Sequence, residues 1–337
     1  MGNTSIEWTE FTWNFLRGCS LATMPGPNGK PVLREGCRHC YARDTGGRFC
    51  GPGLPYEGLV IIQGASAHWT GKVDFSEDHL LDPLRKKKPT MIFVNSMSDL
   101  FHPNAKREWV DLGFSVMLLC PQHTFQSLTK RPDIQRDYIN SVETPKRIAE
   151  AMRQLVRGNK VSASVFNNGL NIARMLDEGG QLHSYGIGEH IHLGCSIEDQ
   201  PSADWTLPYM RETNWGMKWL SDEPMLAEHT IDLRGISWVV VGGESGPKAR
   251  PMNVEAMRSI VDQCQVAKVS VFVKQMGAHV VTSGITGPNQ HWPRSTGMLD
   301  TGKGYFRKHL VDKKGGDMSE WPQDLRIREY PEDKCQP

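Results

Sequence analysis

The stretch Trp238-Val-Val-Val-Gly-Gly-Glu-Ser-Gly246 has the pattern that decides the fold, because a short β-branched run passes directly into a polar, glycine-rich turn. Short runs of this kind, bounded by turn residues, predict buried strands. Five more such runs are Met91–Val94, Thr124–Leu128, Ile191–Gly194, Met217–Leu220 and Val269–Val273. A further strand is predicted near Trp13–Arg17, so the chain is expected to hold six to seven strands.

Helical patterns between the strands indicate the fold class. They cover Lys106–Leu119, Pro145–Arg157 and Val254–Ala267, with Asn253 as the N-cap of the third. Strands that alternate with helices over this length predict parallel α/β architecture. We therefore expect an α/β fold built as a partial (β/α) barrel of about six to seven parallel strands. A doubly wound open sheet is the second choice.

Two segments interrupt the alternation and suggest the domain organisation. Residues 133–190 are too long for a single crossover and contain a helical portion, so they predict an inserted helical cap. Residues 279–337 are rich in glycine, proline and tryptophan and predict an irregular C-terminal extension. The barrel itself is expected to comprise residues 1–278, and either of the two other segments could help to hold a substrate.

The composition bounds the class of protein. The 337 residues carry 39 Lys+Arg against 38 Asp+Glu, a formal net charge of +1, which excludes a histone-like polycation. With 38% hydrophobic and 23% charged residues, the chain is neither a disordered tail nor a fibrous repeat. No apolar run approaches the roughly 20 residues that a bilayer span needs, and no signal peptide is evident. We therefore expect a cytoplasmic protein without membrane contact.

Polar side chains gather where the predicted strands end, which is where parallel α/β folds place their sites. Six successive strand ends carry such groups, and four of these carry a carboxylate. A shared site explains this pattern better than the general polarity of loops. The candidate catalytic residues among these groups are Glu223, Glu244, Lys274 and Gln275.

The cysteines near the N-terminus carry the clearest chemical signal. Cys37 and Cys40 form a C-x-x-C pair, and Cys19 stands eighteen residues upstream of Cys37. Three thiolates could hold a zinc ion with Cys50 or His39 as the fourth ligand. They could equally hold an iron–sulfur cluster with one iron left open. A redox C-x-x-C is a third reading, although it needs no third cysteine. On spacing alone, zinc and iron–sulfur rank nearly equal.

The other cysteines carry no such signal. Cys120, Cys195 and Cys264 lie in or beside apolar stretches and are expected to be small core residues. Cys335 stands apart from them near the end of the sequence. A long chain without an export signal is expected to keep its thiols reduced, so the even count of eight does not predict disulfides.

Motifs spread over most of the chain resemble a known family. Those at the start are Ser5-Ile6-Glu7-Trp8-Thr9, Thr12-Trp13-Asn14, Gly18-Cys19 and Gly36-Cys37-Arg38-His39-Cys40-Tyr41-Ala42. Those further along are Leu128-Thr129-Lys130-Arg131-Pro132, Ser196-Ile197-Glu198-Asp199-Gln200, Glu223-Pro224, Gly242-Gly243-Glu244-Ser245-Gly246, Arg250-Pro251-Met252 and Lys274-Gln275-Met276-Gly277. Together they resemble a phage and prophage family of proteins with a three-cysteine motif related to radical S-adenosylmethionine (SAM) enzymes.

The resemblance implies two cofactors. Cys19, Cys37 and Cys40 would ligate three irons of a [4Fe–4S] cluster, and SAM would chelate the fourth. An electron from an external flavodoxin- or ferredoxin-type reductant would then cleave SAM to a 5′-deoxyadenosyl radical that abstracts hydrogen from the substrate. One departure concerns the spacing, because radical SAM enzymes commonly have C-x3-C-x2-C, whereas seventeen residues separate Cys19 from Cys37 here. Cys50 is the reserve ligand.

The resemblance also implies cofactor-binding roles for polar residues. His39, just before the last cysteine of the motif, would pack beside the adenine. Ser196 and Glu198 would contact the ribose or the methionyl carboxylate, while Lys130 and Arg131 would neutralise that carboxylate or a substrate phosphate. The turn that would accept the hydrogen bond of the SAM amino group contains Asn95, Ser96, Ser98 and Asp99.

The expected function is a radical SAM enzyme that acts on a modified nucleobase, nucleotide or DNA base. Phages disguise their genomes, and an unactivated C–H bond calls for a radical, so a rearrangement or isomerisation of a decorated thymine is one candidate. Photoproduct-type DNA repair is an alternative. A zinc-stabilised, non-enzymatic module that binds nucleic acid or protein is the competing class, and a cluster protein that has lost SAM cleavage is a third possibility. An infected or lysogenic bacterium would be the host.

Overall fold

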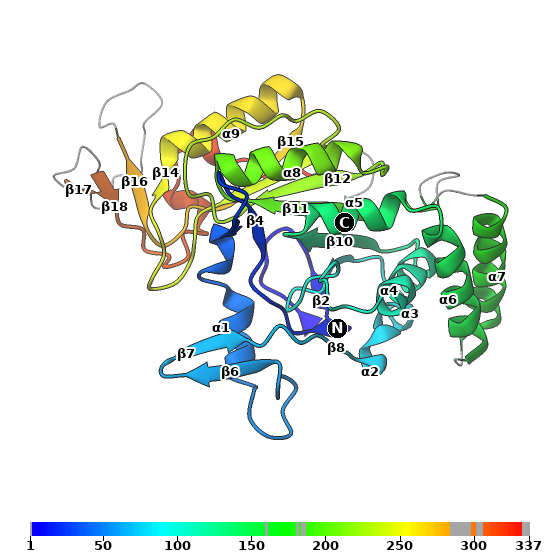
Figure 1. Ribbon diagram of the computed structural model, residues 1–337. Coiled ribbons are helices and arrows are strands. Elements are labelled where there is room, and N and C mark those ends of the chain that lie inside the picture. Colours follow the sequence, from blue (N-terminus) through cyan, green and yellow to red (C-terminus); the bar gives the residue numbers. More distant parts are fainter. Residues whose placement is uncertain are drawn as a thin grey trace.

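An eight-stranded sheet forms the centre of the computed structural model, which describes residues 2–158, 161–179, 182, 187–283, 298–300 and 306–331 (Figure 1). The strands run parallel from β2 to β15, and only β1 is antiparallel to its neighbour. In spatial order they are β1 (Gly2–Asn3), β2 (Phe11–Trp13), β9 (Met91–Val94), β10 (Thr124–Thr129), β11 (Ile191–Ile197), β12 (Lys218–Asp222), β13 (Trp238–Gly242) and β15 (Ser270–Gln275).

The six apolar runs from Met91 onward are confirmed as strands, since each coincides with one strand of this sheet to within three residues at either end. The predicted strand near Trp13–Arg17 divides in two. β2 ends at Trp13, and Leu16–Arg17 forms β3, which pairs with β8 (Asp74–Phe75) outside the main sheet. The chain leaves the sheet here because the backbone N–H of Leu16 donates to Asn95 Oδ1 rather than to a neighbouring strand.

The predicted partial barrel is wrong, because the sheet is open and has β1 and β15 at its two edges. The outer side of β15 is already occupied: the C-terminal segment bridges to it at Phe272 and Arg328, and Val273 N donates to the carbonyl of Ile327. β15 therefore cannot pair with the first strands. The doubly wound alternative also fails, since the strands from β2 to β15 follow one another across the sheet in sequence order without a reversal.

The helices that follow these strands agree with the sequence patterns. The three predicted helices are confirmed to within one residue, and Asn253 Oδ1 caps the last by accepting from Glu255 N and Ala256 N. The helices are α1 (Tyr41–Gly47), α2 (Glu77–Leu80), α3 (Asp82–Arg85), α4 (Arg107–Leu119), α5 (Pro132–Asn140), α6 (Thr144–Gly158), α7 (Ala163–Asp177), α8 (Gln200–Glu212) and α9 (Val254–Ala267). No helix among the described residues is long and apolar enough to span a bilayer.

The two faces of the sheet differ because successive side chains of a strand alternate between them. One face packs against the helices, with strand residues such as Ile92, Phe125 and Val239 buried in two large apolar clusters. The opposite face carries an aromatic cluster instead. Its buried members are Trp8, Phe93, Trp219, Trp238, Val240 and Phe272. The aromatic cluster does not cover the carboxyl ends of the strands, so a site can form there.

The part of the N-terminal third that follows β3, with β4 (Thr23–Pro25) and α1, lies on the side toward which the arrows of β10 and β11 point (Figure 1, blue). After β2 and β3 it forms two antiparallel hairpins with helix α1 between them. The hairpin strands are β4 (Thr23–Pro25) with β5 (Pro31–Leu33), and β6 (Val60–Gln63) with β7 (Ser66–Trp69). A single-turn 3₁₀ segment, η1 (Glu35–Cys37), leads into the C-x-x-C turn.

Two further segments complete the fold. Within residues 133–190, helices α6 and α7 pack on α4 in the helix-side core. The C-terminal extension adds short strands to β14 (Met252–Asn253) and ends in two 3₁₀ turns, η3 (Met318–Glu320) and η4 (Gln323–Leu325). Its strands are β16 (Val280–Thr282), β17 (Met298–Asp300) and β18 (Phe306–Lys308). Cys335 lies outside the described residues.

Candidate functional site

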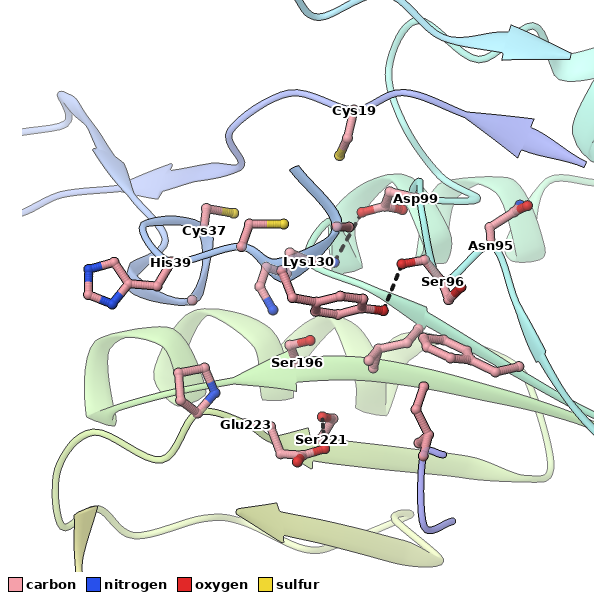
Figure 2. A pocket seen from close by; sticks show the side chains of 18 of the residues that line it. Cys19, Cys37, His39, Asn95, Ser96, Asp99, Lys130, Ser196, Ser221 and Glu223 are labelled. Carbon is pink, nitrogen blue, oxygen red and sulfur yellow. Dashed lines mark hydrogen bonds between the residues drawn. The ribbon is translucent and has the colours of Figure 1, made fainter. Parts of the chain in front are cut away.

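A cavity of about 550 Å³ lies at the carboxyl ends of the strands, and the first three predicted ligands, Cys19, Cys37 and Cys40, all line it. Figure 2 shows the side chains of Cys19 and Cys37 directed into the same space. The volume is within the range of about 300–1,000 Å³ typical of sites for one drug-sized ligand. The other predicted residues that line the cavity are His39, Asn95, Ser96, Ser98, Asp99, Lys130, Arg131, Ser196, Glu223, Glu244, Lys274 and Gln275.

The cysteine thiols of this cavity are shielded from water. Burial raises the pKa of Cys19 to about 12 and also raises the pKa of Cys37. Arg131 acts against the shift at Cys19, and Lys130 does so at Cys37. Cys19 and Cys37 are therefore protonated at neutral pH unless a metal replaces the protons. Thiolates are the soft donors that iron–sulfur clusters and zinc prefer.

A single metal ion and an iron–sulfur cluster need different arrangements of donors. Among the described residues, no three His, Cys, Asp or Glu side chains are grouped closely enough to hold one metal ion. A closed zinc site needs four ligands at about 2.0–2.3 Å from one centre. In a [4Fe–4S] cluster each thiolate binds a different iron, so three thiols spread around one cavity fit it. The reserve ligand Cys50 packs in an apolar cluster beside Tyr56 and does not line the cavity.

Arg131 and Asp99 hold the Cys19 segment against the end of β10. Arg131 Nη1 lies 2.6 Å from Asp99 Oδ2, and its Nη2 donates to the carbonyl and the hydroxyl oxygen of Ser20. The hydroxyl of Thr129 donates to Asp99 Oδ1. Burial opposes ionisation of Asp99, but Arg131 and these donors keep its pKa below its usual range. Asp99 therefore positions the residue after Cys19.

Arg250 and Glu244 hold the C-x-x-C turn against the end of β13. Arg250 Nη2 lies 2.8 Å from Glu244 Oε1, and Arg250 Nη1 reaches Glu35 Oε2 at 3.0 Å. His39 Nδ1 lies 3.0 Å from Glu244 Oε2. Arg250 overcomes the effect of burial and lowers the pKa of Glu244. Glu244 is thus an ionised anchor that fixes the orientation of His39.

Arg34 and Glu198 form the third such contact, at the end of β11. Arg34 Nη2 lies 3.0 Å from Glu198 Oε2, and both side chains are fully buried. Lys130 Nζ lies 3.2 Å from Glu198 Oε1. The two cations offset burial and lower the pKa of Glu198. Gly36 passes directly over this group, since a Cβ there would lie 2.6 Å from Glu198 Oε1. Glu198 therefore lies behind the cavity wall rather than on it.

The turn after β9 is held by contacts within the protein. Ser98 Oγ donates to the carbonyl of Gly18, beside Cys19, and Ser96 Oγ donates to Asn14 Oδ1. The carbonyl of Ser96 accepts from the hydroxyl of Tyr41 at 2.8 Å (Figure 2, dashed line). Asn95 has φ +57, which an Asn tolerates better than most residues, and its Nδ2 has no hydrogen-bond partner among the described residues. It is a buried donor at the cavity.

The wall beyond β12 carries charged pairs. Lys274 Nζ lies 2.9 Å from Glu223 Oε1, and Glu223 Oε2 accepts from the hydroxyl of Ser221. Gln275 Nε2 donates to the carbonyl of Gly243. Lys314, from the C-terminal extension, also lines the cavity and reaches Glu7 Oε1 at 3.3 Å. This wall thus offers both signs of charge to a ligand.

A family model described as a protein of unknown function (DUF5131) matches residues 3–318. The chain belongs to this family. No curated protein and no solved structure matches it. The DUF5131 match includes all strands of the sheet from β2 to β15, both cysteine segments and Lys314, so the cavity is built from family sequence throughout.

Several residues of the site had no assigned role from sequence. Arg34 and Arg250 hold the cysteine segments, Tyr41 reaches Ser96, and Trp8 and Lys314 line the cavity. Arg34, Tyr41 and Trp8 stand within or next to motifs near the cysteines, and that proximity was the available signal. Lys314 offered none, because only the fold brings the C-terminal extension to the cavity.

Proposed function

We propose that this chain is a radical SAM enzyme that acts on a modified nucleobase or nucleotide, as in the hypermodification of phage DNA. The observation that carries the proposal is that Cys19, Cys37 and Cys40 line one cavity at the carboxyl ends of a parallel sheet. A [4Fe–4S] cluster with SAM bound there would supply the electron and the 5′-deoxyadenosyl radical that open an unactivated C–H bond.

Three arginine–carboxylate contacts would keep the cysteines in place. Arg131 with Asp99 fixes the Cys19 segment, while Arg250 with Glu244 and Arg34 with Glu198 fix the segment of Cys37 and Cys40. Each carboxylate follows a different strand of the sheet: Asp99 follows β9, Glu198 follows β11 and Glu244 follows β13. Rigid support of this kind is what precise placement of metal ligands requires.

The lining of the cavity suits flat heterocycles. The aromatic side chains of Trp8, Tyr41, Trp69 and Phe93 line it, and nucleobases and adenine stack on such rings. Its volume of about 550 Å³ suits a small-molecule cofactor and a single base rather than a duplex. A base within a duplex would therefore have to be extruded.

Lys274 and Glu223 are the groups we assign to proton handling at the substrate. They lie 2.9 Å apart at the ends of β12 and β15, and both are largely buried. An ammonium can donate a proton and a carboxylate can accept one, so the pair can protonate or deprotonate a substrate intermediate. The proposal places the enzyme in the cytoplasm of an infected or lysogenic bacterium, with a flavodoxin- or ferredoxin-type protein as electron donor.

Anaerobic purification followed by iron and sulfide analysis tests the proposal. We expect about four irons and four sulfides per chain, absorption near 400 nm, and release of 5′-deoxyadenosine after reduction with SAM present. Cys37→Ala should lose the cluster. Cys50→Ala is the matched control and should retain it, because Cys50 does not line the cavity.

The competing functions give different results in the same experiment. Stoichiometric zinc without absorption near 400 nm would identify the zinc-stabilised binding module and overturn the proposal. A full cluster that releases no 5′-deoxyadenosine on reduction would identify a protein that has lost SAM cleavage. Photoproduct-type repair would appear as restored pyrimidines when ultraviolet-irradiated DNA is the substrate.

A further inference from the structure

The end of β15 holds a buried hydrogen-bond acceptor without a partner among the described residues. Gln275 is only 4% exposed and lines the cavity. Its Nε2 donates to the carbonyl of Gly243 at 2.8 Å, and since a carbonyl oxygen only accepts, the two ends of the amide are assigned unambiguously. Gln275 Oε1 has no partner among the described residues. Leaving such an acceptor unpaired costs about 1–3 kcal/mol, so it is a site for a ligand N–H.

Hydrogen-bond donors line the same cavity as this acceptor. Lys274 precedes Gln275, and its ammonium has three N–H groups, of which Glu223 takes one. The indole N–H of Trp8 is also buried, lines the cavity and has no partner among the described residues.

A continuous series of contacts joins these groups. Glu7, the neighbour of Trp8, contacts Lys314 at 3.3 Å, and the carbonyl of the next residue, Gly315, accepts from Met276 N at 2.8 Å. The end of β15, the C-terminal extension and the segment before β2 therefore form one wall. On this wall an acceptor is accompanied by donors.

We infer that this wall is a substrate subsite that recognises the imide edge of a thymine or uracil ring. That edge presents one ring N–H between two carbonyl groups, which complements the acceptor Gln275 Oε1 and the donors of Lys274 and Trp8. Cytosine presents an unprotonated ring nitrogen at the same position, which would face Gln275 Oε1 as a second acceptor. The inference rests on the proposed function for what happens to the bound ring, although the recognition itself does not need the radical step.

The subsite also sets the orientation of the ring. The C-x-x-C turn is held at the ends of β11 and β13, through Arg34 with Glu198 and Arg250 with Glu244. Gln275 ends β15, the strand next to β13. A ring held by its imide edge at Gln275 points its carbon 5–carbon 6 edge away from Gln275. The substituent on carbon 5 would therefore face into the cavity that the three cysteines also line.

Binding of thymidine and of N3-methylthymidine to the anaerobically purified full chain tests the subsite, because the methyl group replaces the ring N–H and leaves both ring carbonyl groups in place. Isothermal titration with and without SAM should show at least about tenfold tighter binding of thymidine. 2′-Deoxycytidine should bind as weakly as the methylated nucleoside. The same comparison within a single-stranded oligonucleotide distinguishes a free nucleoside from a base in nucleic acid.

In Gln275→Leu, thymidine and N3-methylthymidine should bind with nearly equal affinity. Gln135→Leu is the matched control and should retain the preference, because Gln135 is likewise buried with an unpartnered Oε1 but does not line the cavity. Equal binding of thymidine and N3-methylthymidine by the wild type, in both the nucleoside and the oligonucleotide, would overturn the inference. So would an unchanged preference in Gln275→Leu.

This readout is independent of the proposed function. A preference for thymidine in a chain that contains no iron would leave the subsite standing while the radical SAM proposal fails. Release of 5′-deoxyadenosine without any preference for the ring N–H would support the radical SAM proposal and overturn the subsite.

Discussion

Arg34 and Glu198 form an ion pair whose side chains are both fully buried, although 164 residues separate them in sequence. Arg34 comes from the segment that carries the cysteines, and Glu198 follows β11 of the sheet. Arg34 also donates to the carbonyl of Ser196 at 2.5 Å and to the hydroxyl of Thr206. The pair therefore joins the cysteine segment to the centre of the fold.

Glu198→Gln should destabilise the protein strongly. The substitution leaves the buried charge of Arg34 without its carboxylate, which typically costs about 3–5 kcal/mol. Urea unfolding followed by circular dichroism measures the free energy of unfolding. Asp232→Asn, which breaks an exposed pair with Arg234, is the control and should leave the stability unchanged. Equal stability of Glu198→Gln and the wild type would show that the pair contributes little.

Gly36→Ala should reduce both stability and iron content. The new Cβ would lie 2.6 Å from Glu198 Oε1 and 2.9 Å from Lys130 Cε, so either these side chains or the turn before Cys37 must shift. Overpacking of this kind costs about 1–3 kcal/mol. Gly216→Ala is the matched control, because nothing lies within 4 Å of its Cβ position. Iron analysis of the two variants, purified in parallel, should show loss only in Gly36→Ala.

Asp99→Asn should weaken metal retention more than it weakens folding. The amide cannot balance the charge of Arg131, which then holds Ser20 and the adjacent Cys19 less firmly. Loss of a residue that supports a metal ligand commonly costs 10–100-fold in affinity, so we expect about that change in iron release to a chelator. Glu212→Gln, at an exposed pair with Arg136, should release iron at the wild-type rate.

His229 and Asp222 should make stability depend on pH. Burial alone would lower the pKa of His229, but Asp222 Oδ2, 3.2 Å from its Nε2, raises the pKa to about 8. Since this value exceeds the ordinary 6.5 of histidine, the stabilisation is fully present below pH 6.5 and is lost as the pH rises through about 8. We expect a loss of roughly 1–2 kcal/mol.

Urea unfolding between pH 5.5 and 9 checks this dependence on the His229 proton. The difference in unfolding free energy between the wild type and His229→Gln should shrink as the pH rises, because glutamine does not titrate. A constant difference over this range would mean that the proton on His229 does not stabilise the fold.

The strands and helices were predictable because local composition determines them. Met91–Val94 and Val254–Ala267 agree with the structure residue for residue, since a short apolar run bounded by polar turns and a capped amphipathic run each have one favourable conformation. Closure of the sheet was not predictable in the same way. It depends on which segment pairs with the outer side of β15. That segment contains Arg328, which lies more than fifty residues further along the chain.

The sequence was sufficient to predict which residues line the candidate site, but not which residues they contact. Glu244 and Lys274 line the cavity as expected for groups at strand ends. Their partners, Arg250 and Glu223, depend on side-chain geometry across several loops, which no spacing rule supplies. For the same reason Glu198 was expected to contact a cofactor, whereas it is fully buried against Arg34.

The contact between Glu7 and Lys314 has a consequence for biosynthesis, because 307 residues separate its two partners. At about 5–20 residues per second, the ribosome makes Lys314 some 15–60 s after Glu7. Throughout that interval the cavity lacks Lys314 and the contact that joins the N-terminal segment to the C-terminal extension. A metal can therefore be loaded into the completed pocket only after Lys314 has been translated.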